Sequence, residues 1–117
     1  MYINHEIGSF GEKIANKYLE NIGYEILEKN FTCKQGEIDI IAKDKHEIVF
    51  IEVKTRTSTK YGKPAEAVNN TKQKHIYNSA KYYLYKNNKQ NIFVRFDVLE
   101  IYLSKTKVKI NHIKQVI

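Results

Sequence analysis

Asp39, Glu52 and Lys54 are the residues of this sequence whose types and spacing could support hydrolytic chemistry. They lie in segments 36–42 and 48–54, which are rich in β-branched residues and are joined by a polar stretch, a pattern that predicts a β-hairpin. In the register that keeps one face of the hairpin apolar, Asp39 faces Glu52. Directly opposed like charges are unfavourable, and a divalent cation between them reverses that effect. The hairpin is therefore a candidate metal site with a lysine beside it.

The register follows from the apolar residues, because a slip of one residue would mix the two faces of the hairpin. We expect the turn at 44–47. Three apolar pairs then form one face: Ile40 with Ile51, Ala42 with Val49 and Ile38 with Val53. Three further pairs form the other face: Ile41 with Phe50, Asp39 with Glu52 and Glu37 with Lys54.

Two interpretations of these charges stay open from the residue pattern alone. Charges in a strand covered on both faces need compensation, because burying an uncompensated charge costs several kcal/mol. One solution is a network of Glu52, Lys54 and Glu37 at a solvated end of the sheet. The other is a metal site in which Asp39 and Glu52 are hard oxygen ligands suited to Mg²⁺. Lys54 would then lie beside the attacking water.

The elements that position these residues are predicted from hydrophobic periodicity and from capping residues. The prediction comprises a helix at 6–22 that ends before Gly23, a strand at 24–30, the hairpin, a polar loop at 55–65, a helix from 69 or 70 to 86, and strands at 92–102 and 108–113. This α-β-β-β-α-β-β order predicts an α/β fold with a mixed five-stranded sheet flanked by helices.

Each predicted helix has an apolar face. In the first helix it consists of Ile7, Phe10, Gly11, Ile14, Ala15, Tyr18, Leu19 and Ile22. In the second helix it consists of Gln73, Ile76, Tyr77, Ala80 and Leu84. Glu12 lies at the margin of the first face and could lean toward a site at the sheet edge, although an ordinary solvent-facing glutamate has the same spacing.

Length and composition are those of one globular domain, residues 1–117. Hydrophobic residues make up 42% of the chain, and no apolar run approaches membrane-spanning length. The single cysteine, Cys33, has no intrachain partner. We therefore expect a cytoplasmic protein that does not insert into a membrane.

The net charge of +7 is concentrated in one part of the chain. Between Lys54 and Lys89 there are nine basic residues and one acidic residue, Glu66, whereas the rest of the sequence is nearly balanced. This asymmetry favours a polyanionic partner such as nucleic acid, although a basic stretch can also be an ordinary solvated surface.

Several short strings resemble the YraN-like family of small bacterial proteins, and the likeness covers nearly the entire chain. The strings are Gly36-Glu37-Ile38-Asp39, the run from Val49 to Arg56, Gly11-Glu12, Lys72-Gln73 and Arg95-Phe96-Asp97. That family is similar to the PD-(D/E)xK nucleases, which share the restriction-endonuclease-like fold, and especially to archaeal Holliday-junction resolvases. Asp39 followed by Glu52-x-Lys54 is a loose motif alone and a more specific one with these flanking strings. Ile38 stands where the nuclease motif has proline.

The resemblance implies a restriction-endonuclease-like core with Asp39, Glu52 and Lys54 at its active edge. It implies an endonuclease that depends on Mg²⁺ or Mn²⁺ and hydrolyses DNA, including branched or repair intermediates. By the same likeness Glu12 contributes to metal binding, and Gln73 positions water or phosphate. Four basic residues would neutralise flanking phosphates: Arg56, Lys60, Lys72 and Lys74. Resolvase-like relatives act as two-fold dimers, so a homodimer is a further expectation.

Two other functions remain compatible with the same residues. One is a non-catalytic nucleic-acid-binding module that keeps the nuclease-like fold, and the other is an interaction domain whose basic second helix docks on an acidic protein. Tyr82 and Tyr85 lie among the lysines of that helix and could stack on bases, although such tyrosines are more often amphipathic surface residues.

Overall fold

Five strands form one mixed sheet in the computed structural model, which describes residues 3–57, 70–89 and 91–116. The elements in chain order are α1 (Ile3–Asn21), β1 (Glu25–Cys33), β2 (Gly36–Asp44), β3 (Glu47–Arg56), α2 (Asn70–Lys86), β4 (Phe93–Leu103) and β5 (Val108–Ile113). The strands lie side by side in sequence order; β3 and β4 run parallel, and the other three pairs are antiparallel. The predicted order of elements and the mixed sheet are confirmed, and they are consistent with a restriction-endonuclease-like core.

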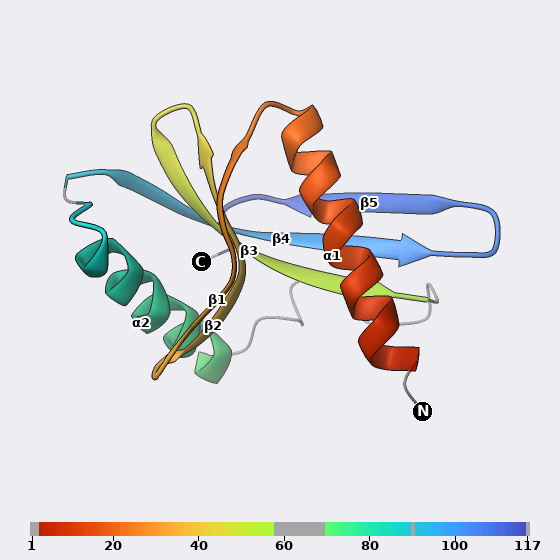
Figure 1. The fold of residues 1–117 in the computed structure, drawn as a ribbon, viewed down its shortest axis with the longest axis horizontal. Helices are drawn as coiled ribbons and strands as arrows, with labels where there is room; N and C mark the ends of the chain where they lie inside the picture. Colours follow the sequence, from red (N-terminus) through yellow and green to blue (C-terminus); the bar gives the residue numbers. More distant parts are fainter. Residues whose placement is uncertain (1–2, 58–69, 90, 117) are drawn as a thin grey trace.

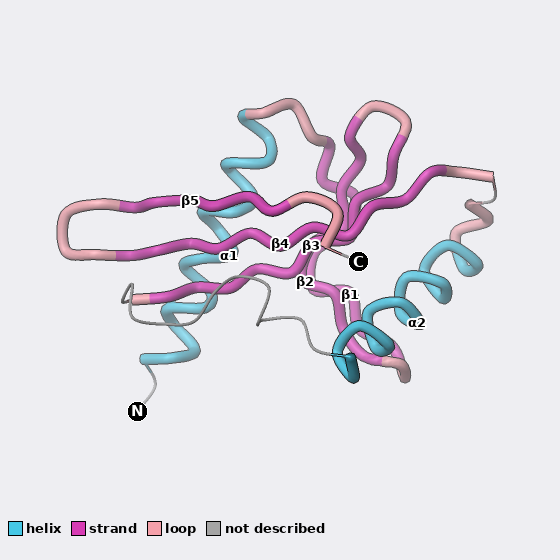
Figure 2. Tube along the Cα trace, turned by 180° about the vertical axis from the view of Figure 1, so that it is seen from behind, coloured by secondary structure: helices cyan, strands magenta, loops and turns pink. Residues whose placement is uncertain are grey.

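The two helices cover opposite faces of the sheet, so the fold has three layers (Figure 1). Seen from behind, α1 lies beyond β3, β4 and β5, while α2 lies at the other end of the sheet near β1 and β2 (Figure 2). Ala15 and Leu19 of α1 are fully buried against one face. Ile76, Ala80 and Tyr83 of α2 are buried against the other. Burial on both faces explains why the central strands are nearly continuous apolar runs.

The described part of the chain contains no helix that is both long enough and apolar enough to cross a membrane.

Helix α1 ends where the sequence predicts. Gly23 adopts a φ of 95°, and the amides of Gly23 and Tyr24 bond back to the carbonyls of Glu20 and Leu19. This left-handed ending satisfies helix carbonyls that would otherwise lack a partner. The predicted apolar face is wrong at Phe10 and Ile22, which are 53% and 44% exposed, and the Ile7 side chain lies outside the described residues. The sheet is covered mainly by the middle turns of the helix.

The inward face of α2 also differs from the prediction. Tyr77 is 53% exposed, whereas Tyr83 and Ser79 are buried. Tyr83 places its ring edge-on to Phe31 and Phe50, with ring centroids 5.4 and 6.0 Å apart. The helix is therefore rotated toward an aromatic cluster that helical spacing alone did not reveal.

The hairpin of β2 and β3 has the predicted register only near its turn. Pairing runs from Asp44–Glu47 to Ile40–Ile51 and ends there within the described strands. The expected pairs beyond that point, Asp39–Glu52, Ile38–Val53 and Glu37–Lys54, are wrong. Strand β2 instead stays paired with β1 as far as Gly36, and both leave β3, so a fork opens between β2 and β3 (Figure 1).

The fork also explains why β1 is longer than expected. The strand predicted to end at residue 30 continues as far as Cys33, because Phe31 pairs with Ile38. Asn30 takes a φ of 53°, a local irregularity of the kind that bends a strand. As a consequence Ile38 packs on the α2 side of the sheet, while Ile40 packs on the α1 side.

Candidate functional site

Asp39 lies at the point where β2 and β3 separate. Its Oδ2 accepts a hydrogen bond of 2.8 Å from the backbone N–H of Val53, which replaces the strand pairing lost there. Burial raises the pKa of Asp39 from its ordinary 3.8 to about 6; the Val53 hydrogen bond opposes this, and the charges of Glu52, Glu12 and Glu37 add to it. Asp39 is thus held among like charges, and Lys72 is close enough for the charge of Asp39 to help raise the pKa of that lysine.

Glu52 extends from β3 on the face that α2 covers, and two lysines contact it. Lys54 Nζ lies 3.0 Å from Glu52 Oε2, and Lys72 Nζ of α2 contacts the same oxygen. The Glu52 side chain is 12% exposed. Burial lowers the pKa of Lys72, but its hydrogen bond and charge attraction to Glu52 outweigh burial, and the pKa is raised. The Glu52–Lys54 contact of the network left open by the sequence is therefore present, with Lys72 as a further member.

Glu12 is brought to the fork by a close approach of α1 to β3. A Cβ on Gly11 would lie 1.9 Å from Oγ1 of Thr55, so only glycine fits there. One residue further on, Glu12 lines a hollow together with Asn16 and Asp39. The structure thus places Asp39, Glu52 and Glu12 within electrostatic range of one another, although none of them pairs directly with another.

The predicted phosphate-binding residues that the structure describes differ in their surroundings. Lys72 points toward Glu52, whereas Lys74 is exposed. The Arg56 Nε donates to Oε2 of Glu100 at 3.2 Å. Gln73 is half-buried near the start of α2, one residue after Lys72. The predicted contact by Lys60 lies outside the described residues.

Comparison with known proteins places the sequence of this chain in a family. Residues 11–101 match the model described as "Uncharacterised protein family UPF0102". The chain belongs to the UPF0102 family. A UPF0102 protein of Clostridium botulinum (strain Kyoto / Type A2) is 60% identical over 104 residues, which cover 88% of this chain and 85% of that protein. A UPF0102 protein of Caldanaerobacter subterraneus subsp. tengcongensis is 53% identical over 110 residues, 92% of this chain and 90% of that protein.

The residues matched to the UPF0102 model begin at Gly11, the contact between α1 and β3. They include Glu12, the fork with Asp39, and the two lysines on Glu52. The YraN-like resemblance drawn from the sequence is therefore confirmed at the level of the family, and the matched segment contains every described residue of the candidate site.

The oxygen atoms at the fork of this UPF0102 chain are suited to a hard cation. Asp39 and Glu12 supply carboxylates, and Asn16 lines the same hollow. The Asn16 Oδ1 is buried and has no hydrogen-bond partner in the described structure. Carboxylate and amide oxygens are the ligands that Mg²⁺ takes. Within the described residues no three His, Cys, Asp or Glu side chains already form a metal-binding group, so a cation would draw Glu52 away from its lysines.

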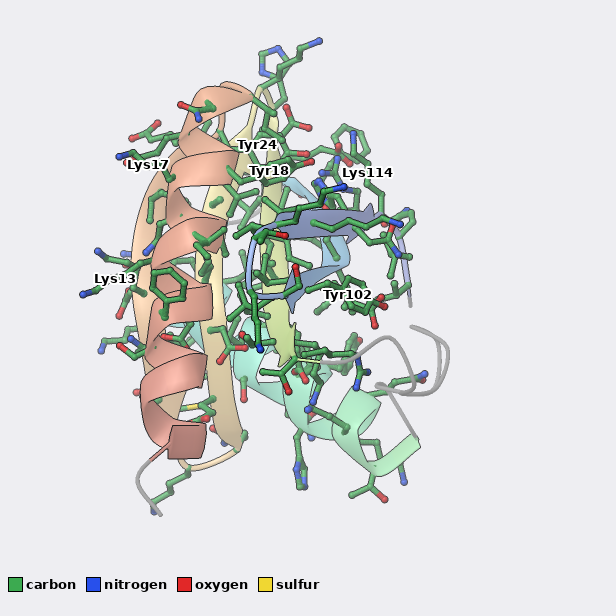
Figure 3. All side chains as sticks on the ribbon, turned by 90° about the vertical axis from the view of Figure 1, so that its right-hand side faces the viewer. Lys13, Lys17, Tyr18, Tyr24, Tyr102 and Lys114 are labelled. Atoms are coloured by element: carbon green, nitrogen blue, oxygen red, sulfur yellow. The ribbon has the colours of Figure 1, made fainter. Side chains whose placement is uncertain are left out.

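Sequence reasoning missed Glu100, which anchors Arg56. The Glu100 side chain is fully buried and accepts hydrogen bonds from Arg56, from the Tyr102 hydroxyl at 2.8 Å and from Asn111. Glu100 lies beside Lys54 in the parallel β3–β4 pairing. Tyr102 projects from the side of the sheet away from α1 (Figure 3). The available signal was an acidic residue between hydrophobic neighbours on a long strand. The strand prediction did not use it.

Arg95 and Asp97 form an ion pair at the centre of a larger network. Two Arg95 nitrogens donate to the two Asp97 oxygens, each at 2.9 Å. His112 Nε2 lies 2.8 Å from Asp97, and the Tyr24 hydroxyl lies 2.6 Å from Arg95. This network lies on the α1 side of the sheet, where Tyr18 and Tyr24 lie between α1 and the strands (Figure 3).

Proposed function

We propose that this UPF0102 chain is a Mg²⁺-dependent nuclease that hydrolyses phosphodiester bonds in DNA. The observation that carries the proposal is the fork, where Asp39 is held with a raised pKa beside other carboxylates while lysines approach from β3 and α2. A stable fold gains nothing from that repulsion. A cation and a phosphate would balance both sets of charges at once.

Asp39 and Glu52 would hold the ion, with Glu12 and the Val53 carbonyl as further oxygen donors. When bound, the ion supplies Lewis acidity and makes an attacking water more acidic. The chain's own contribution is positioning. Val53 N–H fixes the Asp39 carboxylate at 2.8 Å, and the fork keeps strand pairing from closing over it.

Lys54 and Lys72 would serve the phosphate. Both contact Glu52 and can turn from it toward an anionic oxygen, because lysine is a flexible point charge with three donors. Lys54 would orient the attacking water and offset charge that builds on the phosphorus centre. Gln73, next to Lys72, would position water or phosphate.

The flanking phosphates would be neutralised by Arg56, Lys60 and Lys74. Glu100 fixes the direction of the Arg56 side chain through the bond at Nε. The sequence contains no motif for reading base edges, so recognition of DNA structure rather than sequence is the expectation. Branched or repair intermediates are the proposed substrates. A homodimer and a cytoplasmic location stay predictions.

A second function is favoured by one specific observation. Glu52 already has two lysine partners, and a satisfied acid–lysine network is what a non-catalytic nucleic-acid-binding module would retain. In such a module the fork would be structural, and the basic residues alone would bind the polyanion.

Cleavage of single-stranded, duplex and four-way-junction DNA, with Mg²⁺ or Mn²⁺ against EDTA, separates the two functions. We expect cleavage by the wild type and a loss of about a hundredfold or more in Lys54→Ala and Glu52→Gln. The matched control is Lys43→Ala, an exposed lysine near the turn of the same hairpin, which should cleave normally.

Metal binding has a readout that does not depend on cleavage. Mg²⁺ at about 100 times its Kd should stabilise the wild type by roughly 2.7 kcal/mol, measured as a rise in Tm, and should stabilise Asp39→Asn much less. If no metal raises the Tm and Lys54→Ala matches the wild type on every DNA, the nuclease proposal fails and the binding module remains.

A further inference from the structure

The outward face of α2 carries an alternation of lysines and tyrosines. Lys74, Tyr77, Lys81 and Tyr85 follow one another at helical spacings of three and four and lie on the face opposite the buried Tyr83. Tyr77 is 53% exposed and Tyr85 is 82% exposed. We name these four residues the tyrosine–lysine face.

The exposed tyrosines contribute little to the core. Tyr83 of the same helix makes the packing contacts with the sheet, and it is 5% exposed. A tyrosine stabilises a fold mainly when its ring is buried. Exposed tyrosines are instead typical of binding surfaces, where a partner can cover the ring. The face therefore needs a partner that takes up the rings.

The charge on this helix selects a polyanion. Helix α2 contains four lysines and no Asp or Glu. Lys81 Nζ lies 5.4 Å from the centre of the Tyr77 ring, a cation–π arrangement that holds the charge beside the ring. A partner for this face must offer negative charge and flat apolar groups in alternation.

A single nucleic-acid strand has that alternation, because each phosphate is followed by a base whose face is free. In a duplex the base faces are stacked on one another, so only the lysines would find partners. An acidic peptide would engage the lysines and leave the two rings without flat partners. Tyr77 and Tyr85 are separated by about 12 Å along the helix, so the two rings would stack on bases that are not adjacent in the strand.

The tyrosine–lysine face lies next to the fork, so binding there would bear on what reaches the candidate site. Helix α2 starts beside the site, where Lys72 contacts Glu52. Lys74 is two residues further along and points outward, so a strand that leaves the fork would pass directly onto the tyrosine–lysine face.

We propose that the outer face of α2 is a stacking platform for single-stranded nucleic acid, with Tyr77 and Tyr85 on the bases and Lys74 and Lys81 on the phosphates. Within the proposed function, on which this role rests, the platform selects substrates with an unpaired strand next to the scissile bond, such as flaps, gaps or the arms of open junctions.

The test measures binding alone, in EDTA, so its result is independent of cleavage. Fluorescence anisotropy compares the wild type, Tyr77→Ala/Tyr85→Ala and Tyr77→Phe/Tyr85→Phe on oligo-dT, oligo-U and blunt duplex DNA. We expect the alanine double variant to bind the single strands about tenfold more weakly or worse, while its affinity for duplex stays within about twofold. The phenylalanine variant keeps the rings and should bind like the wild type. The two single strands report whether DNA or RNA is preferred.

The matched control is Phe93→Ala, because Phe93 is 75% exposed but lies at the start of β4 rather than on α2. It should bind every probe like the wild type. Unchanged oligonucleotide binding by the alanine variant would overturn the platform, and so would equal losses on single strands and duplex. Competition by polyglutamate as effective as by oligo-dT would show a docking face for acidic proteins instead. The nuclease proposal fails separately, through Lys54→Ala and the metal readout.

Discussion

Two aspartates on neighbouring parts of the sheet show how the same side chain is used in opposite ways. Asp97 is buried on the α1 side and accepts hydrogen bonds from Arg95, His112 and a backbone amide. Burial raises its pKa, but the hydrogen bonds from His112 and Arg95 outweigh burial, and the pKa of Asp97 is lowered. Asp39 has one amide partner and several acidic neighbours, and its pKa is raised to about 6.

The difference separates a region whose charges are matched, as stability requires, from the region in which we propose a ligand site. Around Asp97 the buried charges are matched with good geometry, which is what an ion network needs to repay the cost of burial. Around Asp39 the chain instead gathers further acids, whose charges add to the effect of burial on the pKa of Asp39. Strongly perturbed carboxylates with identifiable neighbours are typical of functional sites, although structural networks can also produce them.

The largest expected effect comes from breaking the matched network. Arg95→Ala would leave Asp97 buried without its bidentate partner and would also free Asp44 and Glu47 from Arg95. We expect a loss of about 3–5 kcal/mol in the free energy of unfolding, measured by urea denaturation. The control is Lys54→Ala at the fork, which should change stability by less than about 1 kcal/mol because Lys72 still contacts Glu52. Comparable losses in both variants would contradict the division into a structural region and a functional one.

The parts of this arrangement that the sequence predicted are those set by local periodicity. Element order, the end of α1 at Gly23 and the hairpin register near its turn all follow from spacing and residue type. The Arg95–Asp97 pair was also within reach, because residues two apart in a strand share a face.

The fork could not be predicted from the sequence, because it depends on competition between β1 and β3 for pairing with β2. Ile38 pairs with Phe31 of β1 rather than with Val53, and the bend at Asn30 supports that choice. Neither preference is visible in the hairpin sequence. For the same reason the predicted opposition of Asp39 and Glu52 was wrong as a strand pair, while the expectation that the two acids lie near each other was correct.

The second effect is a pH dependence that should have opposite signs in the two regions. The pKa of Asp39 is higher in the folded protein than its ordinary 3.8, so between about pH 4 and 6 the folded state binds more protons than the unfolded state. Asp39 therefore favours folding as the pH falls, by roughly 3 kcal/mol in total. Asp97, with a lowered pKa, contributes stability above its ordinary pKa, and that contribution is lost as the pH falls.

Urea denaturation of the wild type and Asp39→Asn at pH 4.5 and pH 7.5 isolates the fork from the rest of the titration. The free energy of unfolding of the wild type, minus that of Asp39→Asn, should be larger at pH 4.5 than at pH 7.5. A difference that is constant with pH, or that favours the wild type at pH 7.5, would mean that Asp39 is as well neutralised as Asp97.

The smallest effect concerns the contact that brings Glu12 toward the fork. Gly11→Ala would place a Cβ 1.9 Å from Thr55 Oγ1, so α1 would have to move away from β3 at a cost of about 1–3 kcal/mol. Gly8→Ala is the matched control, because no atom lies within 4 Å of its added Cβ and alanine favours a helix by roughly 1 kcal/mol. Thr55→Ala removes the closest atom and should restore part of the Gly11→Ala loss. If Gly11→Ala is instead as harmless as Gly8→Ala and keeps its Mg²⁺-induced rise in Tm, then the approach of α1 to β3 does not hold Glu12 at the site. In that case the fork would depend on β2 and β3 alone.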